Sequence, residues 1–251
     1  MLHEGLFRWK KHMMNEMLLL VSLLFIYGSA LLGYYLFGKA GLYVISAVAT
    51  VLANIEVMIL VHAFGMDQTL GNVLFAVTFL ITDILSECEG KRAANKAVWT
   101  GIFASVFFLA LSRSWLLYIP AEGDTLASAI CAVFSNTPRM ILASLTVYAV
   151  SQFFDVWLYH RWWRFTEKHF GDRRRFLWLR NNGSTLISQI VNTLLFNLLA
   201  FWGVYDSATL LSIFISSYLI FVVTSLADTP FVYWARRISE RRQAQGATEA
   251  A

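Results

Sequence analysis

Ionisable side chains stand inside long apolar stretches of this sequence: Glu56, Asp83, Glu87, Arg139, Asp155 and Asp228. A charged side chain at the centre of a membrane helix costs about 2.5–3.5 kcal/mol on insertion scales, so such a set indicates partners or a function. Two interpretations remain open. In one, the residues form structural ion pairs, such as Arg139 with Asp155 or Asp83, or lie where water solvates them. In the other, they line a path for a substrate or an ion.

Helical spacing places several of these residues on common faces. Asp83 and Glu87 are four residues apart, and Gln152 and Asp155 are three apart, so each pair shares a helix face. A further stripe of hydroxyl and amide side chains contains Asn182, Thr185, Ser188, Gln189 and Asn192. Polar groups of this kind, flanked by aromatic residues, suit a flat organic molecule that forms hydrogen bonds rather than a bare ion.

The sequence has no pattern typical of catalysis. It contains no HExxH, no GxSxG, no phosphate-binding loop and no cluster of histidines and cysteines with the spacing of metal ligands. The cysteines, Cys88 and Cys131, are too few for a disulfide framework. We therefore expect no catalytic residue, no metal and no cofactor, and predict that the protein is not an enzyme.

Composition indicates the environment of the chain. Of its 251 residues, 58% are apolar and 14% are charged, against about 45–50% and 25% in soluble domains. The mean hydropathy is +0.58. These values exclude a soluble globular protein and predict a polytopic membrane protein whose surroundings are the lipid bilayer. The net charge of +4 does not indicate a nucleic-acid partner, because the basic residues lie in blocks that flank the apolar segments.

Seven segments have the length of about 20 apolar residues that a bilayer core requires. They are 17–37, 41–63, 70–87, 97–118, 126–158, 184–203 and 207–235. The expected fold is therefore an all-α bundle of about seven transmembrane segments, with a six-helix core and an added N-terminal helix. The segment 126–158 is longer than a bilayer requires, and Pro138 predicts a break or kink within it. Inside a membrane, such a break is tolerated where it is buried in protein or lines a wet cavity.

The distribution of lysine and arginine predicts orientation. Basic residues are concentrated in the loop 159–180, around 91–96 and around 236–242. Seven spans place these regions and the C-terminus in the cytoplasm and the N-terminus outside. If 70–87 is re-entrant instead, the N-terminus returns to the inside. The predicted organisation is an N-terminal segment 1–16, a single transmembrane domain 17–237 with the cytoplasmic loop 159–180, and a disordered cytoplasmic tail 238–251.

Several motifs resemble the queuosine precursor transporter family, also called the vitamin uptake transporter family. They are Thr82–Glu87 (TDILSE), Ser135–Arg139 (SNTPR), Ser151–Val156 (SQFFDV) and Leu177–Thr185 (LWLRNNGST) followed by Ser188-Gln189. The motifs come in the family's order and spacing, between about residues 40 and 237. Two positions depart from the family's usual residues: Asn192 replaces an aspartate, and Cys88-Glu89 replaces Lys-Tyr. The first change bears on substrate choice or ion coupling.

The resemblance implies a multi-pass protein of the bacterial inner membrane that imports 7-deazaguanines for salvage into tRNA modification. The compounds are 7-cyano-7-deazaguanine, 7-aminomethyl-7-deazaguanine and queuine. We expect Asp155 or Asp83 to accept hydrogen bonds from the guanine-like edge. The full set of expected substrate-binding residues is Asp83, Glu87, Asn136, Arg139, Gln152, Asp155, Asn182, Gln189 and Asn192. Candidates for ion coupling are Asp83, Glu87 and Asp228.

Alternatives to this function remain. The chain could carry another flat heterocycle, such as a purine or a vitamin. It could be a substrate-binding subunit beside a separate energising module rather than a carrier driven by an ion gradient. A membrane-embedded enzyme or a scaffold is a further alternative from another class. The sequence does not decide among the coupling modes, the preferred 7-deazaguanine or the oligomeric state.

Overall fold

The computed structural model describes residues 2–135, 138–171 and 176–249. Within them lie the helices α1 (Leu2–Phe37), α2 (Lys39–Glu56), α3 (Gly71–Cys88), α4 (Lys91–Trp115), α5 (Ala127–Phe134), α6 (Pro138–Phe170), α7 (Leu177–Phe196) and α8 (Ser207–Glu249). A short π-helical segment, η1 (Asn197–Phe201), extends α7, and a hairpin of β1 (Leu60–Ala63) and β2 (Met66–Thr69) joins α2 to α3. The predicted all-α class is confirmed.

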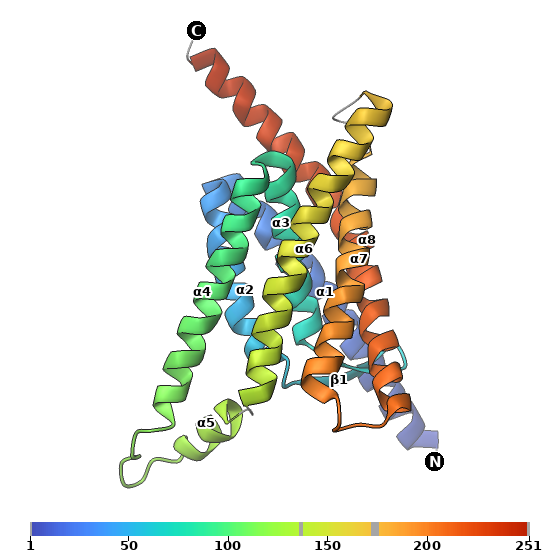
Figure 1. The fold of residues 1–251 in the computed structure, drawn as a ribbon. Helices are drawn as coiled ribbons and strands as arrows, with labels where there is room; N and C mark the ends of the chain where they lie inside the picture. Colours follow the sequence, from blue (N-terminus) through green and yellow to red (C-terminus); the bar gives the residue numbers. More distant parts are fainter. Residues whose placement is uncertain (1, 136–137, 172–175, 250–251) are drawn as a thin grey trace.

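The long helices run alternately up and down, and the two chain ends lie at opposite ends of the bundle (Figure 1). Six helical stretches, in α1, α2, α3, α4, α7 with η1, and α8, are long and apolar enough to cross a membrane. The remaining long helix, α6, has 33 residues and so reaches about 50 Å. It packs along α7, so the described chain passes along the bundle seven times. The chain is thus a multi-pass membrane protein.

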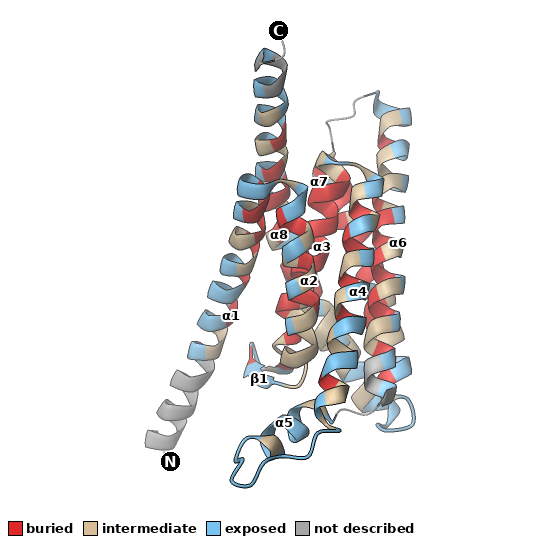
Figure 2. Cartoon of the chain, turned by 90° about the vertical axis from the view of Figure 1, so that its left-hand side faces the viewer, coloured by how far each residue is buried: buried red, intermediate tan, exposed pale blue. Residues whose placement is uncertain are grey.

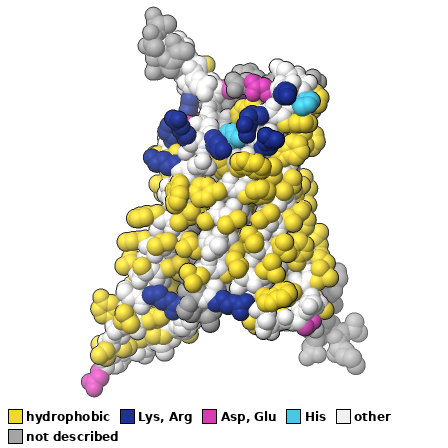
Figure 3. Space-filling view, viewed as in Figure 1, with side chains coloured by type: hydrophobic (Ala, Val, Ile, Leu, Met, Phe, Trp, Pro, Cys, Tyr) yellow, Lys and Arg dark blue, Asp and Glu magenta, His cyan; other side chains and the backbone are white. Residues whose placement is uncertain are grey.

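The outer surface fits a lipid environment. Figure 3 shows a broad band of hydrophobic side chains around the middle of the molecule, with lysine and arginine at its two edges. Large apolar residues such as Leu24, Phe25 and Phe103 are more than half exposed on this surface. More of the basic side chains in this view lie toward the end at which the C-terminus emerges. We call this the basic end of the bundle, and the end with the hairpin the hairpin end.

The segment 126–158 is divided as Pro138 predicts. Helix α5 ends at Phe134, and α6 begins at Pro138, the first helical position, where a proline costs no hydrogen bond. The predicted loop 159–180 is wrong in detail. Its described residues are largely helical, because α6 continues to Phe170 and α7 begins at Leu177. Residues 172–175 lie outside the described part of the chain.

The prediction of one span over 41–63 is wrong at its C-terminal end. Helix α2 ends at Glu56, and the apolar residues that follow enter strand β1. The two-residue turn of the hairpin, Phe64-Gly65, has positive φ at both positions, 54° and 72°. This is the backbone of the turns that close tight hairpins. Helix α8 continues to Glu249, through most of the tail 238–251 that the sequence predicted to be disordered.

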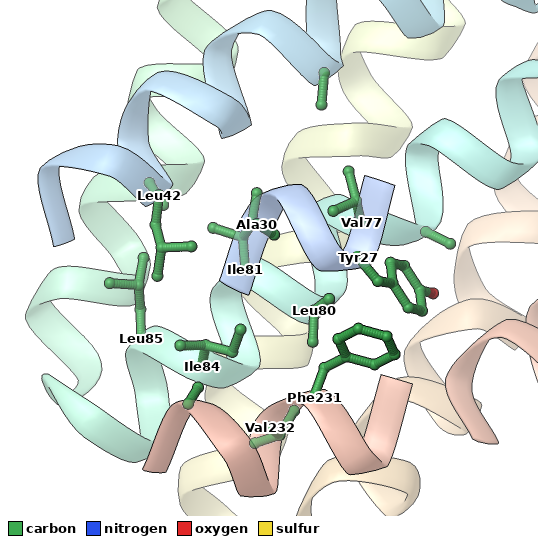
Figure 4. Packing of buried hydrophobic residues seen from close by; sticks show 14 of the residues in the cluster. Tyr27, Ala30, Leu42, Val77, Leu80, Ile81, Ile84, Leu85, Phe231 and Val232 are labelled. Atoms are coloured by element: carbon green, nitrogen blue, oxygen red, sulfur yellow. The ribbon is translucent and has the colours of Figure 1, made fainter. Parts of the chain in front are cut away.

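Helix α3 separates two environments. One face carries Val77, Leu80, Ile81, Ile84 and Leu85, which are buried in an apolar cluster with residues from α1, α2 and α8 (Figure 4). The other face carries Thr78, Thr82, Asp83 and Ser86, which are also buried. The view turned by 90° shows buried residues on α3 and α7 along the inside of the bundle (Figure 2). Helix α3 therefore presents a polar face toward α6 and α7.

Candidate functional site: a buried polar core

Four helices contribute polar side chains to the interior of the bundle. We call this set the polar core. Helix α3 contributes four of its members, α6 three, α7 six and α8 three: Thr78, Thr82, Asp83, Ser86, Ser151, Gln152, Asp155, Asn181, Asn182, Thr185, Ser188, Gln189, Asn192, Ser225, Asp228 and Thr229. Burying so many polar groups is costly unless each is hydrogen-bonded, so a set of this size indicates a site.

Two carboxyl groups lie close together within the polar core. Asp83 of α3 and Asp155 of α6 are fully buried and close enough for their charges to interact. Thr185 donates to Oδ2 of Asp83 over 3.0 Å, and Ser188 donates to Oδ1 of Asp155 over 2.7 Å. The other oxygens, Oδ1 of Asp83 and Oδ2 of Asp155, have no hydrogen-bond partner among the described residues. These two acceptors can receive hydrogen bonds from a ligand or hold a proton between them.

Further polar atoms in the same core lack partners. Asp228 of α8 accepts a hydrogen bond from Nδ2 of Asn181 over 2.6 Å. Oδ1 of Asn181, Oε1 of Gln189 and Oγ of Ser86 are buried and have no partner within the described parts of the chain. Buried polar atoms are nearly always hydrogen-bonded in native proteins. These orphans therefore indicate that water or a ligand completes the core.

Three predicted binding residues hold the helices together. Gln152 donates to Thr78 over 2.6 Å and accepts from Thr82 over 3.2 Å, which joins α6 to α3. Asn182 donates to Thr229 of α8 over 2.8 Å, and Asn192 accepts from Ser151 of α6 over 3.3 Å. All three lie in the polar core. Their contacts position α3, α6, α7 and α8, and their role toward a substrate stays a prediction.

Glu87 lies one helical turn beyond Asp83 and is fully engaged. Its two oxygens accept from Nη2 of Arg180, each over 2.8 Å, and Oε2 also accepts from the Tyr159 hydroxyl over 2.7 Å. Nη1 of Arg236 lies 3.5 Å from Oε1. The Arg180 guanidinium also stacks over the Trp163 ring at 4.4 Å. We call Glu87, Tyr159, Arg180 and Arg236 the Glu87 cluster; it occupies the oxygens that Glu87 would need to bind a substrate.

The pairing of Arg139 with Asp155 or Asp83, which belonged to one of the two interpretations left open by the sequence, is not found. Arg139 donates to the backbone carbonyls of Leu199 over 2.8 Å and Trp202 over 2.6 Å. It is 16 residues before Asp155 on α6, which is roughly 24 Å along the helix. The break at Pro138 puts Arg139 at a helix end rather than at membrane depth. Asn136, another predicted binding residue, lies outside the described residues.

A cleft opens at the hairpin end of the bundle. It lies between α2, α4, α5, α6 and α7, and its lining includes Asn54, Phe108, Ser112, Phe134, Ser144 and Phe196. Phe196 is one turn beyond Asn192 on α7, so the buried polar stripe of α7 leads from the polar core toward the cleft. Within the described residues, no group of three or more histidines, cysteines or acidic residues has the arrangement of a metal site.

The sequence reasoning missed Arg180, Asn181 and Tyr159. Arg180 and Tyr159 belong to the basic segment 159–180, for which the sequence predicts a cytoplasmic loop. A signal was present, because Arg180 precedes Ser184 and Ser188 by one and two turns on the same stripe of α7. That spacing places Arg180 on the buried face, where it is fully buried.

Comparisons with known proteins agree with this architecture. A family model described as "Putative vitamin uptake transporter" matches residues 69–235. The chain is 40% identical over 208 residues to a Bacillus subtilis (strain 168) protein named "Probable queuosine precursor transporter", covering 83% of this chain and 89% of that protein. It is 27% identical over 155 residues to the "Queuosine precursor transporter" of Escherichia coli (strain K12), covering 62% and 65%. No solved structure matches. The chain belongs to the vitamin uptake transporter family.

Proposed function

We propose that this protein transports queuosine precursors, the 7-deazaguanines, across the membrane by way of the polar core. The name of the relative that is 40% identical over 83% of this chain supports that substrate class. A transporter needs a polar site between helices that is reachable from the membrane surfaces. The polar core lies between four helices and continues along α7 toward the cleft.

The observation that carries the proposal is the pair of unpartnered oxygens on Asp83 and Asp155. A 7-deazaguanine presents a ring N–H and an exocyclic amine along one edge. One carboxylate accepts both donors in a bidentate pair, as it does with other planar donor groups. The amide of Gln189, whose Oε1 has no partner among the described residues, would bind a further polar group of the base.

The charge balance of the core supports an ion-coupled carrier. Asp83, Asp155 and Asp228 are all buried there, and the nearby Arg180 is bound to Glu87. Two neighbouring carboxylates repel each other strongly in a dry interior, and one proton held between them relieves the repulsion. A shared proton still leaves one carboxylate for the substrate. Asp83 and Asp228 therefore remain candidates for ion coupling, and a separate energising module is the alternative.

We also propose that the protein lies in the bacterial cytoplasmic membrane with its C-terminus in the cytoplasm. Basic residues flank the membrane mainly on the cytoplasmic side. The basic end of the bundle would then face the cytoplasm, and the cleft at the hairpin end would face outward. The chain acts in this account as a carrier.

The test is tRNA queuosine in a bacterial strain that is blocked in precursor synthesis and lacks its own importer. The host must contain the enzymes that use each compound, and the three 7-deazaguanines are supplied separately at low concentration. We expect the chain to restore queuosine with at least one compound, and the Asp155→Asn variant to restore much less. An absence of restoration by folded, membrane-inserted protein would favour another heterocycle or a required energising partner.

A further inference from the structure

The Glu87 cluster connects all four helices that form the polar core. Glu87 belongs to α3, Tyr159 to α6, Arg180 to α7 and Arg236 to α8. Its contacts measure between 2.7 and 3.5 Å. Arg180 is fully buried, and the Glu87 side chain is 4% exposed. One carboxylate therefore joins four helices at the basic end of the bundle.

This cluster closes the polar core on its basic side. Glu87 is four residues beyond Asp83 in α3, which is about 6 Å along the helix axis. On α7, Arg180 precedes Thr185 by five residues and also lies on the basic side of the core. A molecule that rests against Asp83 and Asp155 would have to pass between these side chains to leave at the basic end.

The opposite end of the bundle differs. There the cleft reaches into the space between α2, α4, α6 and α7. Arg139 of α6 reaches across only to backbone carbonyls at the end of α7 and η1, and its contacts are exposed. Buried charged side chains thus join the helices at one end of the polar core, and a cleft lies at the other end.

We propose that the Glu87 cluster is the gate of the transport path at the basic end, and that this structure is the state closed there. The inference rests on the proposed transport function. To release its substrate at the basic end, the protein must separate α3 from Arg180 and Arg236. A cycle of this kind exposes the polar core to one end at a time.

The chemistry of the cluster suits a contact that breaks repeatedly. Apolar packing of similar volume often holds a fold at least as well as a buried ion pair does. An ion pair at the mouth of a path has another property: when the helices part, water enters and solvates both charges together. Removal of one partner without hydration leaves the other charge buried and alone, which is strongly unfavourable. The ion pair is therefore stable while the cluster excludes water, and its partners separate when water enters.

The native Cys88 provides a direct test. Its thiol, in the last turn of α3 beside Glu87, lies close to Ser239 in α8. In a Cys131→Ser background, a Ser239→Cys substitution places a second thiol near Cys88, and an oxidative bridge between them would fasten α3 to α8 next to the gate. The assay is uptake of tritiated 7-cyano-7-deazaguanine by proteoliposomes, before oxidation, after it, and after reduction. Cys131→Ser alone, with Ser239 intact, is the matched control.

We expect oxidation to reduce uptake at least tenfold, reduction to restore it, and the control to be unaffected by either. Binding of the compound to the oxidised protein should persist, because the bridge lies at the opposite end of the bundle from the cleft. Unchanged uptake with the bridge quantitatively formed would overturn the gate and leave the transport function standing. If the reduced double variant and the control both fail to move any of the three 7-deazaguanines, transport by this chain alone is wrong, and the gate with it.

A second variant tests the charge of the gate. Glu87→Gln keeps the shape of the side chain and removes the charge that holds Arg180 and Arg236 together. In the Cys131→Ser background, we expect Cys88 to react with a maleimide several-fold faster in this variant. Glu240→Gln, which alters an exposed partner of Arg236 at 3.3 Å, should leave the rate unchanged. An unchanged rate in Glu87→Gln would contradict the gate.

Discussion

Substitution of Asp155 by asparagine separates substrate recognition from folding. The side chain is fully buried, and its Oδ1 accepts from Ser188 over 2.7 Å. An amide keeps that acceptor and replaces Oδ2 with an N–H₂ group that can donate to the unpartnered Oδ1 of Asp83. The variant should therefore fold and should unfold at a temperature no lower than the parent does.

Binding of a 7-deazaguanine, unlike thermal stability, should be weakened by this substitution. A carboxylate offers the guanine-like edge two charge-assisted hydrogen bonds, each of about 1.5–3 kcal/mol. The amide accepts at most one of them and turns a donor toward the other donor. The expected loss is about 2–3 kcal/mol, which corresponds to roughly 30- to 150-fold weaker binding.

The assay is calorimetric or radioligand binding of 7-cyano-7-deazaguanine to purified protein, with thermal unfolding of the same samples. Asp206→Asn is the matched control. Asp206 is exposed before α8, where its carboxylate accepts from the backbone N–H of Ala208 over 3.1 Å, and asparagine serves equally well at such a position. If a folded Asp155→Asn protein bound the compound within threefold of the parent, the role given to Asp155 would be refuted.

Three further substitutions test the structural account. Glu87→Ala leaves Arg180 buried without its anion and should destabilise the protein by about 3–5 kcal/mol, measured by thermal unfolding, with Glu240→Ala as an exposed control. Gly41→Ala places a methyl group 2.2 Å from the backbone oxygen of Gly33, so α1 and α2 must move apart; a loss of about 1–3 kcal/mol in the same assay is expected, and a neutral result would contradict this packing. Arg139→Ala removes two hydrogen bonds to carbonyls and should leave the affinity for a 7-deazaguanine within twofold of the parent. A large loss of affinity would show that Arg139 belongs to the substrate site.

The sequence predicts the class and the main polar residues well because the bilayer imposes simple rules. Apolar length identifies a membrane helix, and a carboxylate inside such a helix is unusual enough to notice. This reasoning identifies Asp83 and Asp155, helical spacing adds Gln152, and all three lie in one core. Helical spacing also predicts that Thr185 and Ser188 share their face, and both donate to these carboxylates.

The remaining features depend on contacts between distant segments. The partners of Glu87 lie 72 and 93 residues away in Tyr159 and Arg180, so no local pattern reveals that its oxygens are occupied. Charged residues near a helix end are usually exposed to solvent, so charge alone predicts an exposed Arg180. In the structure its side chain is buried. The hairpin after α2 was missed because its apolar residues continue a hydrophobic run, and only the turn at Gly65 distinguishes them.

Counterflow in proteoliposomes that contain only the purified protein tests the central claim most directly, because exchange needs no energy source or partner. Vesicles are loaded with unlabelled 7-cyano-7-deazaguanine, 7-aminomethyl-7-deazaguanine or queuine and diluted into a trace of the tritiated compound. We expect the label to accumulate transiently with at least one compound, and far less with Asp155→Asn. Label in the protein-containing vesicles no higher than in empty ones, for all three compounds and with folded protein, would contradict transport through the polar core by this chain alone.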